Sequence, residues 1–383
     1  MRVLAINPFH GGAHAAFLDG WAAHSRHRID PLTLPPRRWK WRLRHGALTL
    51  ARRLADHPTP DLLWCTDMLD LAAFKAFAPP AIRDRPTVAY FHENQLTYPV
   101  RDGAGRRVDE PADLQPAFTN FTTALAADAV WFNSDFHRRS FLDALCRWLG
   151  SMPDHRPLAE VDAVAGKSAV QHPGVAPPDP RRRNDAACPR PQPRPPLHLV
   201  WAARWEHDKN PDLFFEALDE LDRRGVGFIA SVMGEVFAEQ PPCFAAARRR
   251  LGDRVRRWGW QPDRRVYLES LAGADVFVST ADHEFFGLAA VEAAAEGCLC
   301  VLPRRLAYPE VFGASGAVWH DGTPAGIADA LAPLAARKAS GRTLRDDAAI
   351  DVSPYLWPTR AAAMDDALDR LAGASPRRPE LPG

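Results

Sequence analysis

The sequence predicts an α/β protein built from two doubly wound, Rossmann-like parallel domains. Three observations predict it: a length of 383 residues, short apolar segments that alternate with helical patterns, and one proline-rich interruption near the middle. A chain of this length exceeds one ordinary hydrophobic core. Continuous apolar strands alternating with helices are typical of a parallel sheet covered on both faces. We therefore predict a first domain over 1–175, a linker over 176–196 and a second domain over 197–352.

The first domain is predicted from short buried strands and the turns that end them. Residues 3–7 (VLAIN) form the first strand, and a Gly-Gly turn connects it to a helix over 13–25. A helical pattern over 113–127 lies between the last two strands. Apolar segments that end in a polar residue or a turn predict the remaining strands over 61–67, 87–93 and 129–135.

The second domain repeats this alternation after a linker in which proline and arginine are dense. Proline can neither continue a helix nor donate within a central strand, so the linker is irregular. A late helix over 353–373 can pack back on the first domain, and residues 374–383 form a tail. The apolar segments predict strands over 197–204, 227–234, 255–260, 275–280 and 298–303, with helices over 210–221, 263–272 and 288–296.

The bulk composition argues against several classes of protein. The net charge of +1 gives no global field that attracts nucleic acid or an anionic membrane, so such binding needs a local patch. The six cysteines show no metal-ligand spacing, and free thiols fit a reducing cytoplasm. No apolar stretch has the roughly 18 residues of a membrane span. We expect a cytoplasmic protein that holds no metal; the sequence leaves the oligomeric state open.

Two glutamates flank a glycine turn after the predicted strand over 275–280. Residues 283–297 are HEFFGLAAVEAAAEG, with Glu284 before Gly287 and Glu292 inside the following helix. The first amides of that helix are unpaired and form an anion site. Carboxylates accept hydrogen bonds from hydroxyls, so the two glutamates can hold a hexose and a ribose from different sides. The alternative is structural: Glu284 caps the helix and Glu292 is solvated.

A basic pair lies where the first strand of the second domain ends. Arg204 ends the strand, and Lys209, one of five lysines in the chain, starts the next helix. Side chains at these two positions can converge on one diphosphate. The alternative is a solvated basic pair.

Polar side chains also follow strands of the first domain. The sequence FHENQLTYP places His92, Glu93, Asn94 and Gln95 at a strand end, where they suit polyol recognition. Glu93 is either an acceptor base or a partner of another site residue. A plain polar loop is the alternative. Gly12, in the turn after the first strand, permits a close backbone approach to a phosphate or the acceptor, or serves only a tight turn.

A basic and aromatic segment, PPRRWKWRLRHGALTLARR, covers 35–53. Basic side chains bind phosphate, and indoles stack on unpaired bases, so the segment suits an RNA acceptor. The alternative is an amphipathic segment with solvated arginines and buried tryptophans. The run 181–183 is a second, weaker candidate. The acceptor-binding residues predicted here are Arg38, Trp39, Lys40, Trp41 and Arg42.

These motifs resemble known families at two levels. Arg204 and Lys209, followed by Glu284 and Glu292 with FGL between them, resemble the donor domain of retaining GT-B glycosyltransferases. Nearly the whole chain resembles the tRNA-queuosine α-mannosyltransferase family, a GT-B branch. The motifs that carry this second resemblance are, in order, FHGGAH, PPRRWKWR, YFHENQLTYPV, WFNSDFHRRSF, PDHRP, ARWEHDKNP and TADHEFFGLAAVEA. The linker is shorter than in other members.

The resemblance implies a metal-independent, retaining enzyme that moves mannose from GDP-mannose to queuosine in tRNA-Asp, with the two domains facing a cleft. It implies a catalytic set of His92, Arg204, Lys209 and Glu284. Arg204 and Lys209 would neutralise the departing diphosphate. Glu284 and His92 would lie by the transferred sugar. The backbone of Phe286, Gly287 and Leu288 would meet phosphate, and Glu292 the ribose.

Two other functions stay open at this point. One is a GT-B glycosyltransferase with a lipid or glycan acceptor, for which the segment 37–53 would dock on a membrane. The other is a sugar-nucleotide-dependent RNA-binding protein without turnover. The residues do not fix the donor base, whose recognition we expect near 260–263.

Overall fold

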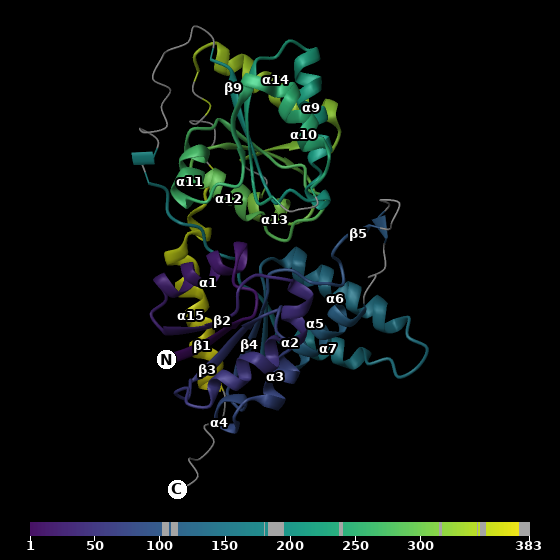
Figure 1. Cartoon of the computed structure of the whole chain (residues 1–383), viewed down its shortest axis with the longest axis vertical. Helices are drawn as coiled ribbons and strands as arrows, with labels where there is room; N and C mark the ends of the chain where they lie inside the picture. Colours follow the sequence, from purple (N-terminus) through teal and green to yellow (C-terminus); the bar gives the residue numbers. More distant parts are fainter. Residues whose placement is uncertain are drawn as a thin grey trace. The chain divides into compact units, whose positions relative to one another are not determined.

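The computed structural model divides into two compact units (Figure 1). Unit 1 comprises Met1–Gly174 and Tyr355–Gly383, and unit 2 comprises Val175–Pro354. Residues 183–194 of the predicted linker and 375–383 of the predicted tail lie outside the described residues. The structure describes residues 1–101, 107–108, 114–179, 181–182, 195–236, 240–313, 316–342, 344 and 350–374.

Unit 1 is built on a six-stranded parallel sheet with the order β2-β1-β3-β4-β7-β8. All four predicted strands are confirmed, and both edge strands were missed. Pro31 lies within β2, where an edge position tolerates the missing amide donor. A short antiparallel pair, β5 and β6, is separate. The strands are β1 (Arg2–Asn7), β2 (Arg28–Thr33), β3 (Leu62–Thr66), β4 (Thr87–Phe91), β5 (Val100–Arg101), β6 (Arg107–Val108), β7 (Ala129–Phe132) and β8 (Ser168–Val170).

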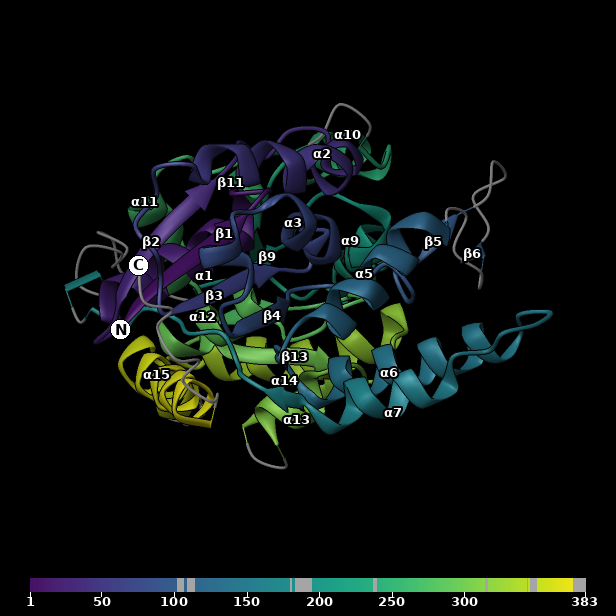
Figure 2. The ribbon, with the colours of Figure 1, turned by 90° about the horizontal axis from the view of Figure 1, so that it is seen from below.

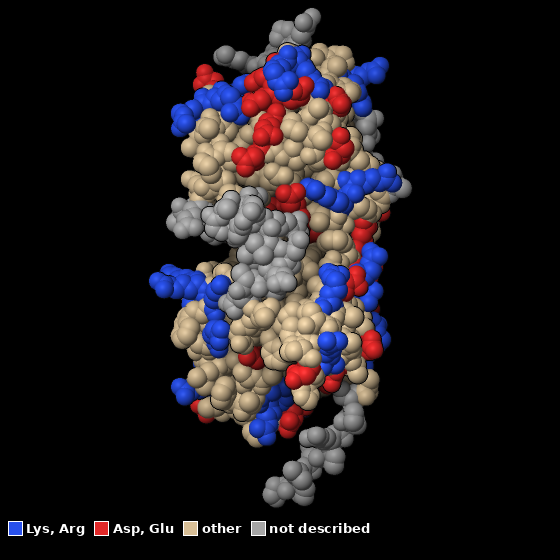
Figure 3. Space-filling view, turned by 90° about the vertical axis from the view of Figure 1, so that its right-hand side faces the viewer, with Lys and Arg blue, Asp and Glu red and all other residues tan. Residues whose placement is uncertain are grey.

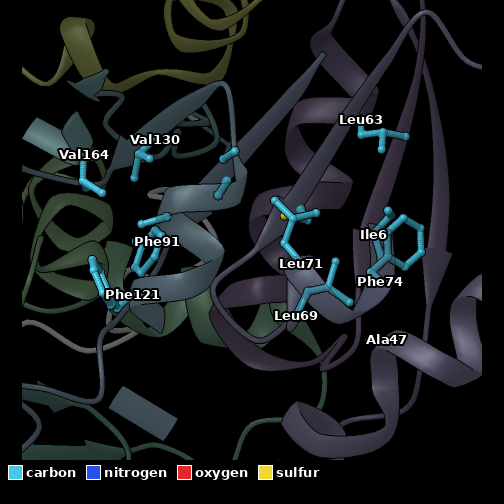
Figure 4. Close-up of a cluster of buried hydrophobic side chains, with 14 of the residues drawn as sticks. Ile6, Ala47, Leu63, Leu69, Leu71, Phe74, Phe91, Phe121, Val130 and Val164 are labelled. Carbon is cyan, nitrogen blue, oxygen red and sulfur yellow. The ribbon is translucent and has the colours of Figure 1, made fainter. Parts of the chain in front are cut away.

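Helices cover both faces of this sheet. On one face, α1 and α15 pack on alternate residues of the strands, such as Val3 and Trp64. On the other face, helices α2, α3, α5, α6 and α7 pack on Ile6, Leu63 and Phe91, as Figure 4 shows in part. Helices α6 and α7 lie side by side (Figure 2). The helices are α1 (Gly12–His24), α2 (Trp39–Ala51), η1 (Arg52–Leu54), α3 (Leu71–Phe77), α4 (Pro80–Arg83), α5 (Leu114–Ala126), α6 (Asp135–Gly150), α7 (Leu158–Gly166), η5 (Ser353–Tyr355) and α15 (Trp357–Ala374).

The late helix α15 belongs to the core of unit 1. Trp357 is 5% exposed, and its ring lies against Gly20 of α1 and Gly174. A Cβ at either glycine would come within 2.3 Å of that ring. Asp365 of α15 accepts a hydrogen bond from Trp21 Nε1 at 3.1 Å. The C-terminal segment thus completes one face of the first sheet.

Unit 2 has a second six-stranded parallel sheet, ordered β11-β10-β9-β12-β13-β14. The five predicted strands and three predicted helices are confirmed; β14, α10, α13 and α14 were missed. The strands are β9 (Leu197–Ala202), β10 (Phe228–Met233), β11 (Val255–Gly259), β12 (Val276–Val278), β13 (Leu299–Pro303) and β14 (Ala317–His320). The helices are η2 (His207–Lys209), α9 (Pro211–Arg223), α10 (Cys243–Leu251), η3 (Gly252–Arg254), α11 (Arg264–Ala272), α12 (Leu288–Ala295), α13 (Tyr308–Phe312) and α14 (Pro324–Ala339).

Because all strands of each six-stranded sheet are parallel, their carboxyl ends meet at one edge, where ligands of such sheets bind. The predicted site residues of unit 2 follow β9 and β12, and His92 of unit 1 follows β4. In the part of the chain that the structure describes, no helix combines the length and the apolar character that a membrane crossing needs.

Candidate functional site

Lys209 lies at the end of η2, in a turn whose sequence fixes its position. The next residue, Asn210, has a φ of 49° and caps α9 by accepting a hydrogen bond from the Leu213 amide. Pro211 at the first helical position suits this start. Thr280 Oγ1, which follows β12, donates to the Lys209 carbonyl at 2.9 Å. The loops after β9 and β12 are therefore joined directly.

The Lys209 ammonium is buried among oxygen atoms. The residue is 8% exposed, and its Nζ donates to the His283 carbonyl at 2.7 Å. The same nitrogen lies 3.1 Å from Asp208 Oδ2 and 3.4 Å from Glu284 Oε2. Burial lowers the pKa of Lys209. The charges of Glu284 and Asp208 together raise it by more than burial lowers it, so the net shift is upward. The predicted phosphate-binding lysine is therefore charged and held in place.

Glu284 faces both Lys209 and the start of α12. Burial raises the pKa of its carboxyl, but Lys209 and the backbone amides of Phe286 and Gly287 lower it more, so the net shift is downward. Gly287 caps α12 with a φ of 91°, and a Cβ there would lie 2.7 Å from the Tyr308 ring. Glu284 thus binds amides before the helix, as the structural alternative held, and remains an ionised acceptor.

A pocket in unit 2 brings several predicted residues together. Its lining includes Lys209, Glu284, Gly287, Ala289 and Tyr308. Each of the first three was predicted from sequence, and Leu288 lies between two lining residues. The pocket therefore combines an ammonium, a carboxylate and the first turn of a helix, which are groups that bind a sugar phosphate.

Arg204 lies outside this lining but within its electrostatic range. Its Nε is 3.3 Å from Glu206 Oε2, and its side chain is 38% exposed. Burial raises the pKa of Asp208. The charge of Lys209 lowers it, and the charge of Arg204 lowers it by a smaller amount, so the net shift is downward. Arg204 is thus an exposed cation beside a buried one, as an anion approaching from solvent requires.

Glu292 is buried, so the structural alternative of a solvated glutamate on α12 is wrong. Glu292 is 6% exposed, and its carboxylate forms an ion pair with Arg264. Tyr267 Oη donates to Glu292 Oε2 at 2.9 Å. Sequence reasoning missed both partners, because α11 and α12 are separate elements and no motif links them.

His283 and Asp208 are further buried polar residues that sequence reasoning missed. His283 Nδ1 lies 3.9 Å from Asp208 Oδ2, and the backbone amide of His283 donates to the Asp208 carbonyl at 3.2 Å. Burial, followed by the charge of Lys209, lowers the pKa of His283 to about 4. The imidazole is therefore neutral near pH 7 and leaves Lys209 as the buried cation of this cluster.

In unit 1, His92 sits in an aromatic environment. Its ring lies 4.1 Å from the His14 ring and 5.1 Å from that of Phe17, centroid to centroid. Burial, followed by the charges of His14 and His137, lowers the pKa of His92 well below its usual range. Its Nε2 atom is buried and has no hydrogen-bond partner among the described residues. The His92 ring is therefore neutral near pH 7.

The loop after His92 is fixed by internal hydrogen bonds. Asp67 Oδ1 accepts from the His92 amide at 2.9 Å, and Asn120 Oδ1 accepts from the Gln95 amide at 2.9 Å. Asn94 is fully buried, and its Oδ1 accepts from both the amide and the hydroxyl of Thr97. The Asn94 oxygen therefore shapes the loop. That Glu93, Asn94 and Gln95 contact the acceptor substrate directly stays a prediction.

Gly12 begins α1 with a φ of 52°, and no heavy atom lies within 4 Å of the place a Cβ would occupy. Its backbone thus faces open space. A Cβ on the neighbouring Gly11 would instead meet Pro36 at 2.4 Å. Gly11 therefore allows close packing on Pro36. Gly12 leaves the start of α1 exposed, as the prediction of phosphate binding requires.

Helix α2 presents its tryptophans to solvent. Trp39 is 36% exposed and Trp41 59% exposed, so the alternative with buried tryptophans is wrong. Lys40 Nζ lies 5.6 Å from the Trp39 ring centroid, and Arg42 Nε donates to the Pro35 carbonyl at 2.9 Å. The buried face of α2 consists of Leu43, Gly46, Ala47, Leu50 and Ala51.

In the second basic candidate, the run 181–183, one arginine forms an ion pair within the protein. Arg182 forms an ion pair with Glu296, which is 1% exposed, and Arg183 lies outside the described residues. Arg182 therefore has a structural partner. Over the described ranges, no group of three or more His, Cys, Asp or Glu side chains could hold a metal ion.

Known families match both parts of the chain. Residues 2–175 match the model of the tRNA-queuosine alpha-mannosyltransferase N-terminal family, and residues 196–337 match that of the glycosyl transferases group 1 family. A tRNA-queuosine alpha-mannosyltransferase of Drosophila melanogaster is 35% identical over 323 residues, covering 81% of this chain and 81% of the relative.

Two further matches concern the fold and the donor class. A GDP-mannose-dependent alpha-(1-6)-phosphatidylinositol dimannoside mannosyltransferase of Mycobacterium tuberculosis is 30% identical over 174 residues, 45% of this chain and 44% of the relative. The solved structure of sucrose-phosphate synthase from Thermosynechococcus elongatus matches with a TM-score of 0.73 at 16% identity, covering 98% of this chain and all of that one. The latter shows the fold alone: two doubly wound domains of the GT-B type.

Proposed function

Because this chain belongs to the tRNA-queuosine alpha-mannosyltransferase family, we propose that it transfers mannose from GDP-mannose to the queuosine nucleoside of tRNA-Asp. The chain is a glycosyltransferase. The observation that carries the finer proposal is the long match to the Drosophila relative, whose name states the acceptor. The name of the mycobacterial relative supports GDP-mannose as donor.

The charges around the pocket of unit 2 support metal-independent departure of the diphosphate. When the bond between the sugar and the β-phosphate breaks, negative charge develops on phosphate oxygens. Lys209 is charged and buried, and Arg204 is exposed beside it. Preorganised cations and helix amides at such a position lower the barrier without a metal ion. The start of α12 supplies the amides in this proposal.

Retention of configuration follows from the proposed donor and the family's product. GDP-mannose carries its mannose in α linkage, and an α-mannoside product has the same configuration. The acceptor hydroxyl attacks the anomeric carbon on the face that GDP leaves, and its proton passes to the departing phosphate oxygen. Glu284, already bound by Lys209 and two amides, positions the sugar as an acceptor of hydroxyl hydrogen bonds.

The exposed basic and aromatic start of α2 supports an RNA acceptor. Trp39 and Trp41 offer faces on which unpaired bases can stack; Arg38 precedes them, and Lys40 lies between them. The same features would suit a membrane surface, which is the docking mode of the lipid alternative. An enzyme that modifies tRNA works in the cytoplasm, where we place this chain.

A transfer assay tests the proposal. The purified chain is mixed with radiolabelled GDP-mannose and EDTA, and with bulk tRNA from cells that contain or lack queuosine. We expect label in RNA only when queuosine is present. Label transferred to lipid or to a glycan, with none in RNA, would replace the acceptor. Transfer from another sugar nucleotide alone would replace the donor, and transfer that EDTA abolishes would contradict the metal-independent step.

A further inference from the structure

Glu292 lies in an environment that does not favour a charged group by itself. Its neighbours on α12 are Ala290, Val291, Ala293 and Ala294, all of them buried. An ionised carboxylate in such surroundings is unfavourable unless it is paired and hydrogen-bonded. The residues that supply those partners therefore determine where the oxygen atoms of Glu292 point.

Helix α11 supplies both partners from one face. Arg264 and Tyr267 are three positions apart, so they lie on the same side of the helix. The Arg264 guanidinium pairs with Glu292 Oε1 and lies 3.4 Å from Oε2, while Tyr267 donates to Oε2 at 2.9 Å. The guanidinium also lies over the Tyr267 ring, 4.9 Å from its centroid. Asp263 caps α11 and so fixes the position of Arg264 at its start.

Each partner acts as a donor, and acceptor capacity is left on the carboxylate. Burial, followed by the Glu292 charge, raises the pKa of Tyr267 well above its usual range, so its hydroxyl keeps its proton and donates. Two carboxylate oxygens offer about four acceptor positions. Arg264 donates to both oxygens and Tyr267 donates to Oε2, so three of these positions are used and one, on Oε1, is left for a ribose hydroxyl.

We infer that Arg264 and Tyr267 are positioning residues that hold the Glu292 carboxylate for a ribose hydroxyl of the donor nucleotide. The inference rests on the proposed function and on the contact between Glu292 and the ribose that the family resemblance implies. Arg264 orients the carboxylate, and Tyr267 prevents its rotation. Neither needs to touch the nucleotide, so both act through Glu292.

The inference is tested by removing hydroxyls from the ligand as well as partners from the protein. Calorimetry gives the dissociation constants of GDP and of 2′,3′-dideoxy-GDP for the wild type. We expect the wild type to prefer GDP by roughly 10- to 100-fold, the usual effect of hydrogen bonds to a charged group. In Arg264→Ala and Tyr267→Phe this preference should largely disappear, and Arg264→Lys should retain part of it because lysine keeps the charge but not the fork.

Arg265→Ala is the matched control. Arg265 is the next residue of α11 and pairs with Glu269 rather than Glu292, so the preference for GDP should persist. If Arg264→Ala lowers the melting temperature but keeps the wild-type preference, the two residues only join α11 to α12, and the inference is overturned. A wild type with no preference would overturn it too, while leaving the transfer assay to decide the function. If another nucleoside diphosphate binds instead of GDP, the proposed donor is wrong. The ratio of dissociation constants is then measured with that nucleotide and its 2′,3′-dideoxy form.

Discussion

At the scale of single residues, the buried ammonium of Lys209 is held in the pocket of unit 2 by oxygen atoms of the protein. Its three contacts are the His283 carbonyl, Asp208 and Glu284, at 2.7, 3.1 and 3.4 Å. The longest contact is the one most easily exchanged for a phosphate oxygen. Exchange there would free the Glu284 carboxylate for a sugar hydroxyl at the same moment.

Lys209→Met is expected to lower turnover by about 100-fold or more, because it removes a preorganised charge at the departing diphosphate. It should also destabilise the chain, since Asp208 would be left buried without its cation. Lys338→Met is the control: Lys338 pairs with buried Asp275 at 2.5 Å, away from the pocket. Both variants should melt earlier in calorimetry, but only Lys209→Met should fail in the transfer assay. Equal turnover in the two would contradict the role of Lys209.

The neutral His283 makes stability depend on pH. Its pKa is about 4 in the folded chain against 6.5 for an ordinary histidine. Because the folded state resists protonation, this contribution is complete above pH 6.5 and is lost as the pH falls from 6.5 to about 4. The loss amounts to about 3 kcal/mol. Denaturant titrations from pH 7.5 to 4.5 should show a shallower decline for His283→Asn than for the wild type; parallel declines would contradict the assignment.

Sequence reasoning reached the site residues that follow strands but missed the residues that support them. Lys209 and Glu284 could be placed because chain order puts both at the carboxyl ends of parallel strands. The contacts of Asp208 and Tyr267 depend on how side chains of separate elements pack, which no local pattern encodes. For the same reason the sequence left the burial of Glu292 open: a single glutamate in an alanine-rich helix can face a pocket or solvent until its partners are known.

At the scale of elements, the central strands were predictable, whereas three of the four edge strands of the two six-stranded sheets, β2, β8 and β14, were missed and only β11 was predicted. The central strands β3 and β4 are buried at every position, so they read as continuous apolar runs. The edge strand β2 has no fully buried residue and contains Pro31, and the edge strand β8 has none either. Exposure on one side removes the apolar signal, so the sheet order could be completed only from the structure.

The contact between α1 and α15 reverses an ordinary rule for helices. Gly to Ala inside a helix usually stabilises by up to about 1 kcal/mol. Gly20→Ala should instead destabilise unit 1 by roughly 1–3 kcal/mol, because the new methyl group would overlap the Trp357 ring. Gly150→Ala, at the open end of α6, has no atom within 4 Å and should be neutral or stabilising. Denaturant titration of both variants measures the difference, and a stabilised Gly20→Ala would show that α15 does not pack there.

At the scale of the whole molecule, charge gives little general attraction for RNA. The net charge is +1, and on the face shown in Figure 3 basic and acidic side chains are interspersed. Binding of a polyanion must then come from a few local contacts rather than from a long-range field. The start of α2 is a described segment in which basic residues lie next to two exposed indoles, those of Trp39 and Trp41.

The salt dependence of tRNA binding should therefore change when α2 loses charge. Each Lys or Arg that neutralises a phosphate contributes close to 1 to the slope of log affinity against log salt, so Arg38→Asn with Lys40→Gln should lower the slope by roughly 1.5 to 2. Asn is chosen at position 38 because Arg38 has a φ of 50°, a conformation that Asn tolerates. The control, Arg223→Gln with Arg265→Gln, removes the same charge from exposed positions of unit 2.

Filter-binding titrations across a salt series separate the two outcomes. A lower slope in the α2 variant alone places phosphate contacts on α2. The same decrease in both variants means that total charge, and not α2, governs binding, and the RNA-binding assignment of this helix is then wrong.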